Sequence, residues 1–137
     1  MDPHPDIADV EMPRKADLPS FRLAPLSPEF IDEDYEAVMA SAEVLKGLWG
    51  DWPEGLTREE DLIDLAWHER EFTLRRSFSW IVRDREGAYL GCAYLFPAPG
   101  RRGEMEGVIW IRDRADRLDL LARLRADLDE WLPGHLP

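Results

Sequence analysis

The sequence has a single cysteine, Cys92, and only two lysines among its 17 basic residues. One cysteine forms neither an internal disulfide nor a cysteine-rich zinc site. The 29 acidic residues outnumber the basic ones and leave a net charge of −12 over 137 residues. Proteins that neutralise nucleic-acid phosphates or rest on anionic lipid normally carry the opposite charge. We therefore expect no nucleic-acid partner and no membrane partner.

Long hydrophobic runs are also missing. The longest strongly apolar stretch, Tyr89–Phe96, is far shorter than the roughly 20 residues that cross a bilayer. Residues 1–5 lack the apolar core of a signal peptide. We therefore expect a cytoplasmic protein. The length and the hydrophobic share of 45% fit one domain with a packed core.

Several catalytic motifs are absent as well. The sequence contains neither a GxGxxG nor a GxxxxGK phosphate loop. His68 begins like a zinc-protease helix, but Phe72 stands where the second histidine is required. We interpret His4, His68 and His135 as ordinary surface histidines, and we expect no metal site.

The first 20 residues differ in composition from the rest of the chain. They contain four prolines and five acidic residues, so regular structure is only weakly encoded. We predict an extended N-terminal arm over residues 1–20, with at most a short strand at Ile7–Met12. A single domain over residues 21–137 follows.

The first half of this domain has the pattern of one strand and two helices. Phe21–Leu26 alternates with a period of two, which predicts a strand. From Tyr35 the apolar residues recur at three- and four-residue steps, which predicts a helix. Thr57–Glu60 matches a capping box and begins a second helix that ends near Arg76. The predicted core-facing residues of the two helices are Val38, Met39, Ala42, Leu45, Leu48, Leu62, Leu65, Ala66 and Glu69.

The second half predicts three strands and a final helix. Ser77–Arg83 and Tyr89–Phe96 flank the turn Asp84–Gly87 and form a hairpin. Met105–Arg112 is a fourth strand, and apolar residues at helical spacing then continue to Trp131. The predicted order is βααβββα. It indicates an α/β (α+β) fold with a mostly antiparallel, four-stranded sheet whose faces are covered by helices.

This order of elements resembles the GNAT acetyltransferase fold. The matching segments are similar to a bacterial group of GNAT-like proteins, and they are Asp34–Ser41, Trp52-Pro53, Leu56–Leu62, His68–Phe72, Leu90–Tyr94 and Trp110–Asp113. The likeness extends from about Phe21 to Leu132. The sequence ends after the helix that follows the fourth strand, so we expect a GNAT-like fold without its fifth strand and the rest of its C-terminal part.

The resemblance implies an N-acetyltransferase that moves an acyl group from acetyl-CoA to a small-molecule amine. The thioester would lie beside the fourth strand, and backbone N–H groups at the start of the next helix would hold the pyrophosphate. The candidate residues are Glu106 as general base, Ile111, Arg112, Arg114 and Arg117 for acetyl-CoA, and Tyr94 and Trp110 for the substrate. Structural roles stay open beside these: a solvated carboxylate for Glu106 and core packing for Tyr94 and Trp110.

A second function class also stays open. GNAT enzymes begin the helix after the fourth strand with Arg/Gln-x-x-Gly-x-Gly/Ala, whose glycines let the backbone approach the phosphates. Arg112 fits the first position here, but Ala115 and Arg117 replace both glycines. Asp113 and Asp116 add negative charge. The alternative is a non-catalytic GNAT-like domain that binds a ligand or a partner, so the pattern does not decide whether the chain is an enzyme.

The fourth strand also suggests self-association. Without a fifth strand beside it, Met105–Arg112 is an exposed apolar edge, and such edges invite pairing with another chain. We expect a homodimer through this edge, assisted by the N-terminal arm. Coverage within one chain, by the arm or by the loop over residues 97–103, is the alternative.

Overall fold

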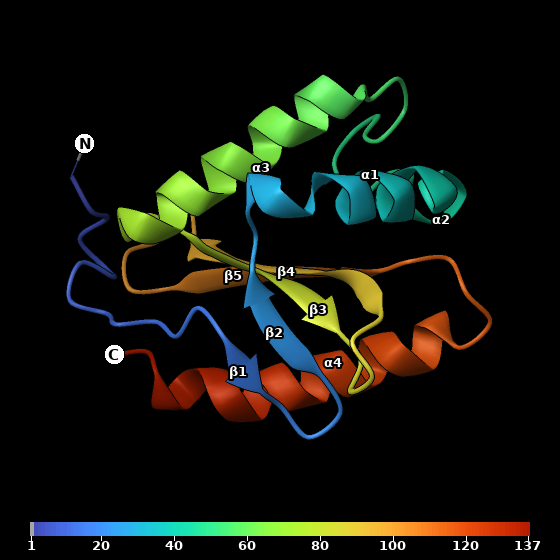
Figure 1. Cartoon of the computed structure of the whole chain (residues 1–137). Coiled ribbons are helices and arrows are strands. Elements are labelled where there is room, and N and C mark those ends of the chain that lie inside the picture. Colours follow the sequence, from blue (N-terminus) through green and yellow to red (C-terminus); the bar gives the residue numbers. More distant parts are fainter. Residues whose placement is uncertain (1) are drawn as a thin grey trace.

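Five antiparallel strands form a sheet with helices on both faces (Figure 1). This computed structural model describes residues 2–137. The strands lie in the sheet in chain order. They are β1 (Ala16–Asp17), β2 (Arg22–Pro25), β3 (Phe78–Arg83), β4 (Tyr89–Pro97) and β5 (Met105–Ile111). The predicted antiparallel pairing of the main strands is confirmed.

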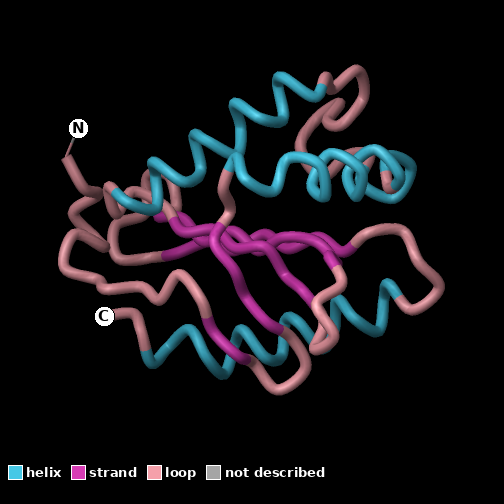
Figure 2. The backbone as a smooth tube through the Cα atoms, viewed as in Figure 1, coloured by secondary structure: helices cyan, strands magenta, loops and turns pink. Residues whose placement is uncertain are grey.

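The helices form two layers around this sheet (Figure 2). They are α1 (Ile31–Ala40), α2 (Ala42–Leu45), α3 (Arg58–Thr73) and α4 (Arg117–Trp131), with short 3₁₀ helices at Pro28–Phe30 and Leu132–Gly134. The helices α1, α2 and α3 cover one face, and α4 covers the other. Within residues 2–137 no strand follows α4. No helix in the same range is long and apolar enough to cross a membrane.

Each face of the sheet buries its own apolar core. Successive strand residues point to opposite faces, so Trp80 and Val82 of β3 join the core beside α4, whereas Ile81 joins the core beside α1 and α3. On β5, Ile111 enters the first core and Trp110 enters the second. The alternation read from the sequence therefore assigns side chains to the two layers correctly.

The N-terminal segment departs from the prediction. A strand at Ile7–Met12 is wrong, because backbone N–H groups there close turns, such as that from Val10 to the carbonyl of Ile7 at 3.1 Å. The short strand lies instead at Ala16–Asp17 and pairs with β2, so the sheet has five strands and not four. The apolar residues of the segment fill the core beside α4, and they are Ile7, Val10, Met12 and Leu18.

The helical region differs in detail. The first predicted helix is broken at Ser41, and Met39 and Leu48 are 36% and 37% exposed instead of core-facing. On α3 the predicted core positions Ala66 and Glu69 are exposed. Polar residues of α3 occupy the interior in their place, among them Asp61. Hydrophobic periodicity does not detect a face whose buried positions include carboxyl groups.

Candidate functional site

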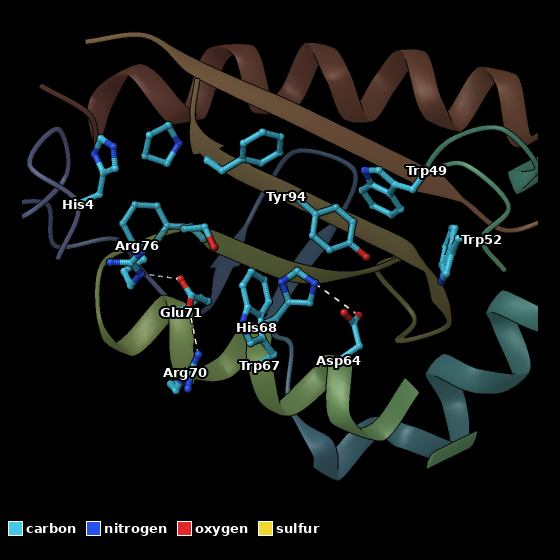
Figure 3. A pocket seen from close by; sticks show the side chains of 14 residues that line it. His4, Trp49, Trp52, Asp64, Trp67, His68, Arg70, Glu71, Arg76 and Tyr94 are labelled. Carbon is cyan, nitrogen blue, oxygen red and sulfur yellow. Dashed lines mark hydrogen bonds and ion pairs between the residues drawn. The ribbon is translucent and has the colours of Figure 1, made fainter. Parts of the chain in front are cut away.

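A cavity of about 770 Å³ opens between α3, the adjacent ends of β3 and β4, and the loop that joins α2 to α3 (Figure 3). Its aromatic lining consists of Trp49, Trp52, Trp67, Phe78, Tyr94 and Phe96. Its ionisable lining consists of His4, Asp64, His68, Arg70, Glu71 and Arg76. Cavities of this size, with an apolar wall and a few converging polar groups, are typical small-molecule sites.

The helix α3 supplies most of the polar lining. The first turn of α3 fixes where the helix begins and thus which of its residues face the cavity. The Thr57 hydroxyl accepts the backbone N–H of Glu60 at 3.1 Å, and the Glu60 carboxylate accepts the N–H of Thr57 at 2.9 Å. This is the predicted capping box. Steps of four and three residues along α3 then place Asp64, His68 and Glu71 on one side of the helix, facing the cavity.

Aromatic rings in edge contact build one end of the cavity. The ring of Trp49 lies 5.1 Å from that of Trp52 and 5.0 Å from that of Tyr94, both in T-shaped geometry. The His68 imidazole lies 5.1 Å from the Tyr94 ring. Such contacts orient the rings as well as burying them. Trp49 and Trp67 keep 40% and 47% of their surface exposed, so a ligand can reach them.

His68 is the residue that the sequence interpretation misjudged. Its side chain is 16% exposed, and Nε2 lies 3.5 Å from Oδ2 of Asp64 one helical turn away. Its Nδ1 is buried and has no hydrogen-bond partner among residues 2–137. The interpretation of His68 as an ordinary surface histidine is therefore wrong. The four-residue spacing from Asp64 was the available signal, but the spacing alone does not reveal the facing Tyr94.

The opposite end of the cavity is an ionic cluster. The buried carboxylate of Glu71 lies 3.2 Å from Nε of Arg76 and 3.5 Å from Nη2 of Arg70. Arg76 also donates to the carbonyl of Asp2 at 2.8 Å, which fastens the N-terminal segment over this end. Two guanidinium groups thus share one carboxylate, and Figure 3 shows them away from Asp64.

Comparison with known proteins identifies the architecture around this cavity. No protein-family model and no curated protein matches the sequence. A provisionally assigned ribosomal-protein-serine acetyltransferase from Vibrio cholerae superposes with a TM-score of 0.62 at 14% identity, over 85% of this chain and 67% of that chain. A provisionally assigned GNAT-family acetyltransferase from Bordetella pertussis gives 0.65 at 13% identity, over 89% and 74%. The fold is GNAT-like. At such identities the likeness establishes the GNAT-like fold alone and carries no activity over.

Two predicted substrate residues of this GNAT-like domain lie together, but only one lines the cavity. The Tyr94 hydroxyl accepts a hydrogen bond from Nε1 of Trp110 at 3.1 Å. Burial raises the pKa of Tyr94 well above its ordinary value, so the phenol is neutral. Trp110 is 1% exposed and lies behind Tyr94 as a core side chain.

Glu106, the predicted general base, lies beside the cavity and not in its lining. It stands on β5 opposite Phe96 of β4. Its carboxylate is 41% exposed and accepts a hydrogen bond from Nη2 of Arg101 at 2.6 Å. A catalytic role for Glu106 stays a prediction.

The predicted acetyl-CoA residues gather where β5 leads into α4, and their arginines already have partners. Arg112 donates to Glu36 at 2.7 Å, and Arg114 donates to Asp116 at 2.5 Å. Arg117 donates to the carbonyl of Ile111 at 2.9 Å. These contacts are alternatives to a phosphate, so an anion bound here would have to displace them.

A backbone N–H at this turn is also engaged. Asp113 donates its N–H to the hydroxyl of the buried Ser41 at 2.9 Å. Ile111 is fully buried and its carbonyl is bonded to Arg117, so it presents no surface to a ligand. The bond to Ser41 ties the start of α4 to the break between α1 and α2.

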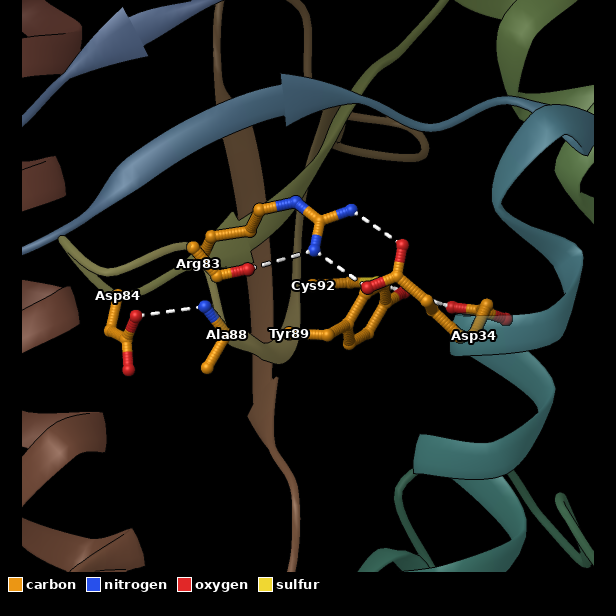
Figure 4. Close-up of polar contacts among 8 residues, drawn as sticks. Asp34, Arg83, Asp84, Ala88, Tyr89 and Cys92 are labelled. Atoms are coloured by element: carbon orange, nitrogen blue, oxygen red, sulfur yellow. Dashed lines mark hydrogen bonds and ion pairs between the residues drawn. The ribbon is translucent and has the colours of Figure 1, made fainter.

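A second group of ionisable residues, Asp34, Tyr89 and Cys92, is buried under α1 and does not line the cavity (Figure 4). The Tyr89 hydroxyl donates to the carboxylate of Asp34 and lies 3.3 Å from Sγ of Cys92. Burial raises the pKa of the Cys92 thiol well above its ordinary value, as expected for a core side chain and not a nucleophile. Among residues 2–137 no group of His, Cys, Asp and Glu side chains is arranged to hold a metal ion.

Proposed function

We propose that this GNAT-like chain transfers an acyl group from acetyl-CoA to an amine bound in the aromatic cavity. The observation that carries the proposal is the pairing of His68 with Asp64 inside a cavity that also contains Tyr94 of β4, the strand next to β5. The GNAT-like fold supports acetyl-CoA as the donor, with its thioester beside β5.

In this reaction the protein orients the amine and the thioester and transfers protons. The amine nitrogen loses a proton and forms a bond to the thioester carbonyl carbon, the carbon–sulfur bond breaks, and the CoA thiolate takes up a proton. We assign the proton acceptor to Nε2 of His68, since Nδ1 is buried, and the Asp64 carboxylate 3.5 Å from Nε2 stabilises the imidazolium formed. Glu106 is the second candidate, but its carboxylate is paired with Arg101 at 2.6 Å and lies outside the cavity lining.

A specific observation favours a second function, that of a non-catalytic ligand-binding domain. The arginines at the start of α4 are held by partners within the chain, and the N–H of Asp113 is bonded to Ser41. A helix start without glycines also brings its N–H groups less close to a pyrophosphate. We therefore expect acetyl-CoA to bind no tighter than about 10 µM.

Calorimetric titration with acetyl-CoA, together with release of free CoA in the presence of a panel of amines, tests the proposal. For an active enzyme, His68→Gln lowers kcat/KM by about 10²- to 10⁴-fold. His135→Gln is the matched control, because His135 lies at the C-terminus against Trp131 and outside the cavity. Absence of acetyl-CoA binding at millimolar concentration would instead assign the chain to the ligand-binding class.

A further inference from the structure

The two ends of the cavity carry opposite charge. At one end Arg70 and Arg76 flank the single carboxylate of Glu71, which leaves an excess of one positive charge. At the other end stands the carboxylate of Asp64, with the His68 imidazole 3.5 Å away. Figure 3 shows the guanidinium groups and Asp64 on opposite sides of His68.

Helix geometry sets the separation of these ends. Asp64 and Glu71 are seven residues apart on α3, which corresponds to about 10 Å along the helix axis. A ligand that reaches both ends therefore needs its own charges several bonds apart. An α-amino acid, with ammonium and carboxylate on one carbon, is too short.

The surface between the ends is apolar and aromatic. Trp67 lies on the same helix between Asp64 and Glu71, and Tyr94 and Trp49 add to the lining from β4 and from the α2–α3 loop. Aromatic faces attract an ammonium group, and they also bury the methylene chain that follows it. The lining thus matches a molecule with a cationic head, an apolar middle and an anionic tail.

We propose that the cavity binds an ω-amino carboxylate, with the ammonium against Asp64 and the aromatic rings and the carboxylate against Arg70 and Arg76. As an acceptor class this rests on the proposed acyl transfer, since the amine next to His68 is the group acylated. Binding itself is independent of that reaction. An ammonium at the other end would meet two guanidinium groups, so the orientation is determined by charge.

Calorimetry without acetyl-CoA tests the proposal with three probes of equal chain length: 6-aminohexanoate, hexylamine and hexanoate. We expect 6-aminohexanoate to bind at least about tenfold tighter than either singly charged probe, since each charge contributes a paired contact. Glycine should not bind measurably. Hexylamine or hexanoate binding as tightly as 6-aminohexanoate, or no binding of any probe, overturns the proposal.

Two substitutions test which end of the cavity binds the ammonium and which binds the carboxylate. Asp64→Asn should weaken 6-aminohexanoate and hexylamine about tenfold and leave hexanoate unchanged, whereas Arg70→Gln should weaken 6-aminohexanoate and hexanoate. Arg70 is preferred to Arg76 because its side chain is 53% exposed and Arg76 also anchors the N-terminal segment. The matched controls are Asp119→Asn and Arg123→Gln, which remove an exposed ion pair on α4. Equal losses in the cavity variants and in their controls contradict the assignment.

The two proposals fail separately. Binding of 6-aminohexanoate with the expected response to the substitutions, but with no CoA release, upholds this inference and removes the acyltransferase. CoA release with amines that lack a carboxylate, at the same kcat/KM as with 6-aminohexanoate, upholds the acyltransferase and removes this inference.

Discussion

Asp61 is a carboxyl group in an apolar interior. It is 2% exposed, and its Oδ2 has no hydrogen-bond partner among the described residues. Burial, and next the neighbouring Asp34, raise the pKa of Asp61 from 3.8 to about 9. The native protein therefore holds a proton at neutral pH that the unfolded chain releases.

This proton makes the stability of the fold pH-dependent. Its contribution is fully present below the ordinary pKa of 3.8 and is lost as pH rises towards about 9. From pH 5 to 8 we expect the free energy of unfolding to fall by up to about 1.4 kcal/mol per pH unit from this group. Asp61→Asn carries no such proton, so its unfolding free energy should vary less with pH.

Urea unfolding of both proteins at several pH values measures the two slopes. The exposed Asp119→Asn serves as the control and should keep the wild-type slope. Equal slopes for wild type and Asp61→Asn would show that Asp61 is ionised in the native state.

Among the elements, the pairing of β4 with β5 is the tightest constraint near the site, because β4 carries Tyr94 into the cavity. Gly91 of β4 lies opposite Ile111. A Cβ at Gly91 would lie 1.9 Å from the backbone carbonyl oxygen of Trp110, whereas one at Gly107 of β5 would meet only the Tyr94 carbonyl at 3.6 Å. Only the first position requires glycine for close backbone approach.

Gly91→Ala should therefore destabilise the protein by roughly 3 kcal/mol or more, since the strands must separate to admit the methyl group. Gly107→Ala is the matched control and should change stability by less than about 1 kcal/mol, since its Cβ contact is ordinary. Thermal and urea unfolding of the two variants provide the comparison. Equal stability of both variants would contradict the observed β4–β5 register.

For the whole molecule, β5 is an outer strand of the sheet, as predicted. The apolar surface it offers is smaller than the sequence indicated, because Trp110 and Ile111 are 1% and 0% exposed. Val108 is only partly buried and belongs to neither core. The N-terminal segment, which was to assist a dimer, is packed into the core of its own chain.

We still propose a homodimer through the β5 edge, and we expect the wild type to self-associate at high micromolar concentration. Val108→Lys should shift it to monomer, since a lysine on an edge strand opposes pairing with another chain. Light scattering after size exclusion measures the mass. Leu118→Lys on α4, where Leu118 is 74% exposed, is the control. A monomeric wild type would remove the proposal, and Trp110→Glu is unsuitable as a probe because it alters the core.

The sequence was sufficient for most of the elements and not for the site. Local signals, such as the capping box at Thr57 and the alternation in β3, depend on residues close together in the chain, and they predicted the strands and the GNAT-like order. The break at Ser41 escaped prediction because the Ser41 hydroxyl is bonded to Asp113, 72 residues away.

The cavity depends on tertiary structure in the same way. Its lining comes from the N-terminal segment, the α2–α3 loop, α3, β3 and β4, and no local pattern indicates that His68 faces Tyr94. The sequence places arginines around the start of α4, but only folding decided that Arg112 is paired with Glu36. Folding also brings Arg70 and Glu71 of α3 together with Arg76, which follows the helix, at one end of the cavity. The sequence gives the chemistry of each side chain, whereas long-range packing brings together the partners that determine what the side chain can do.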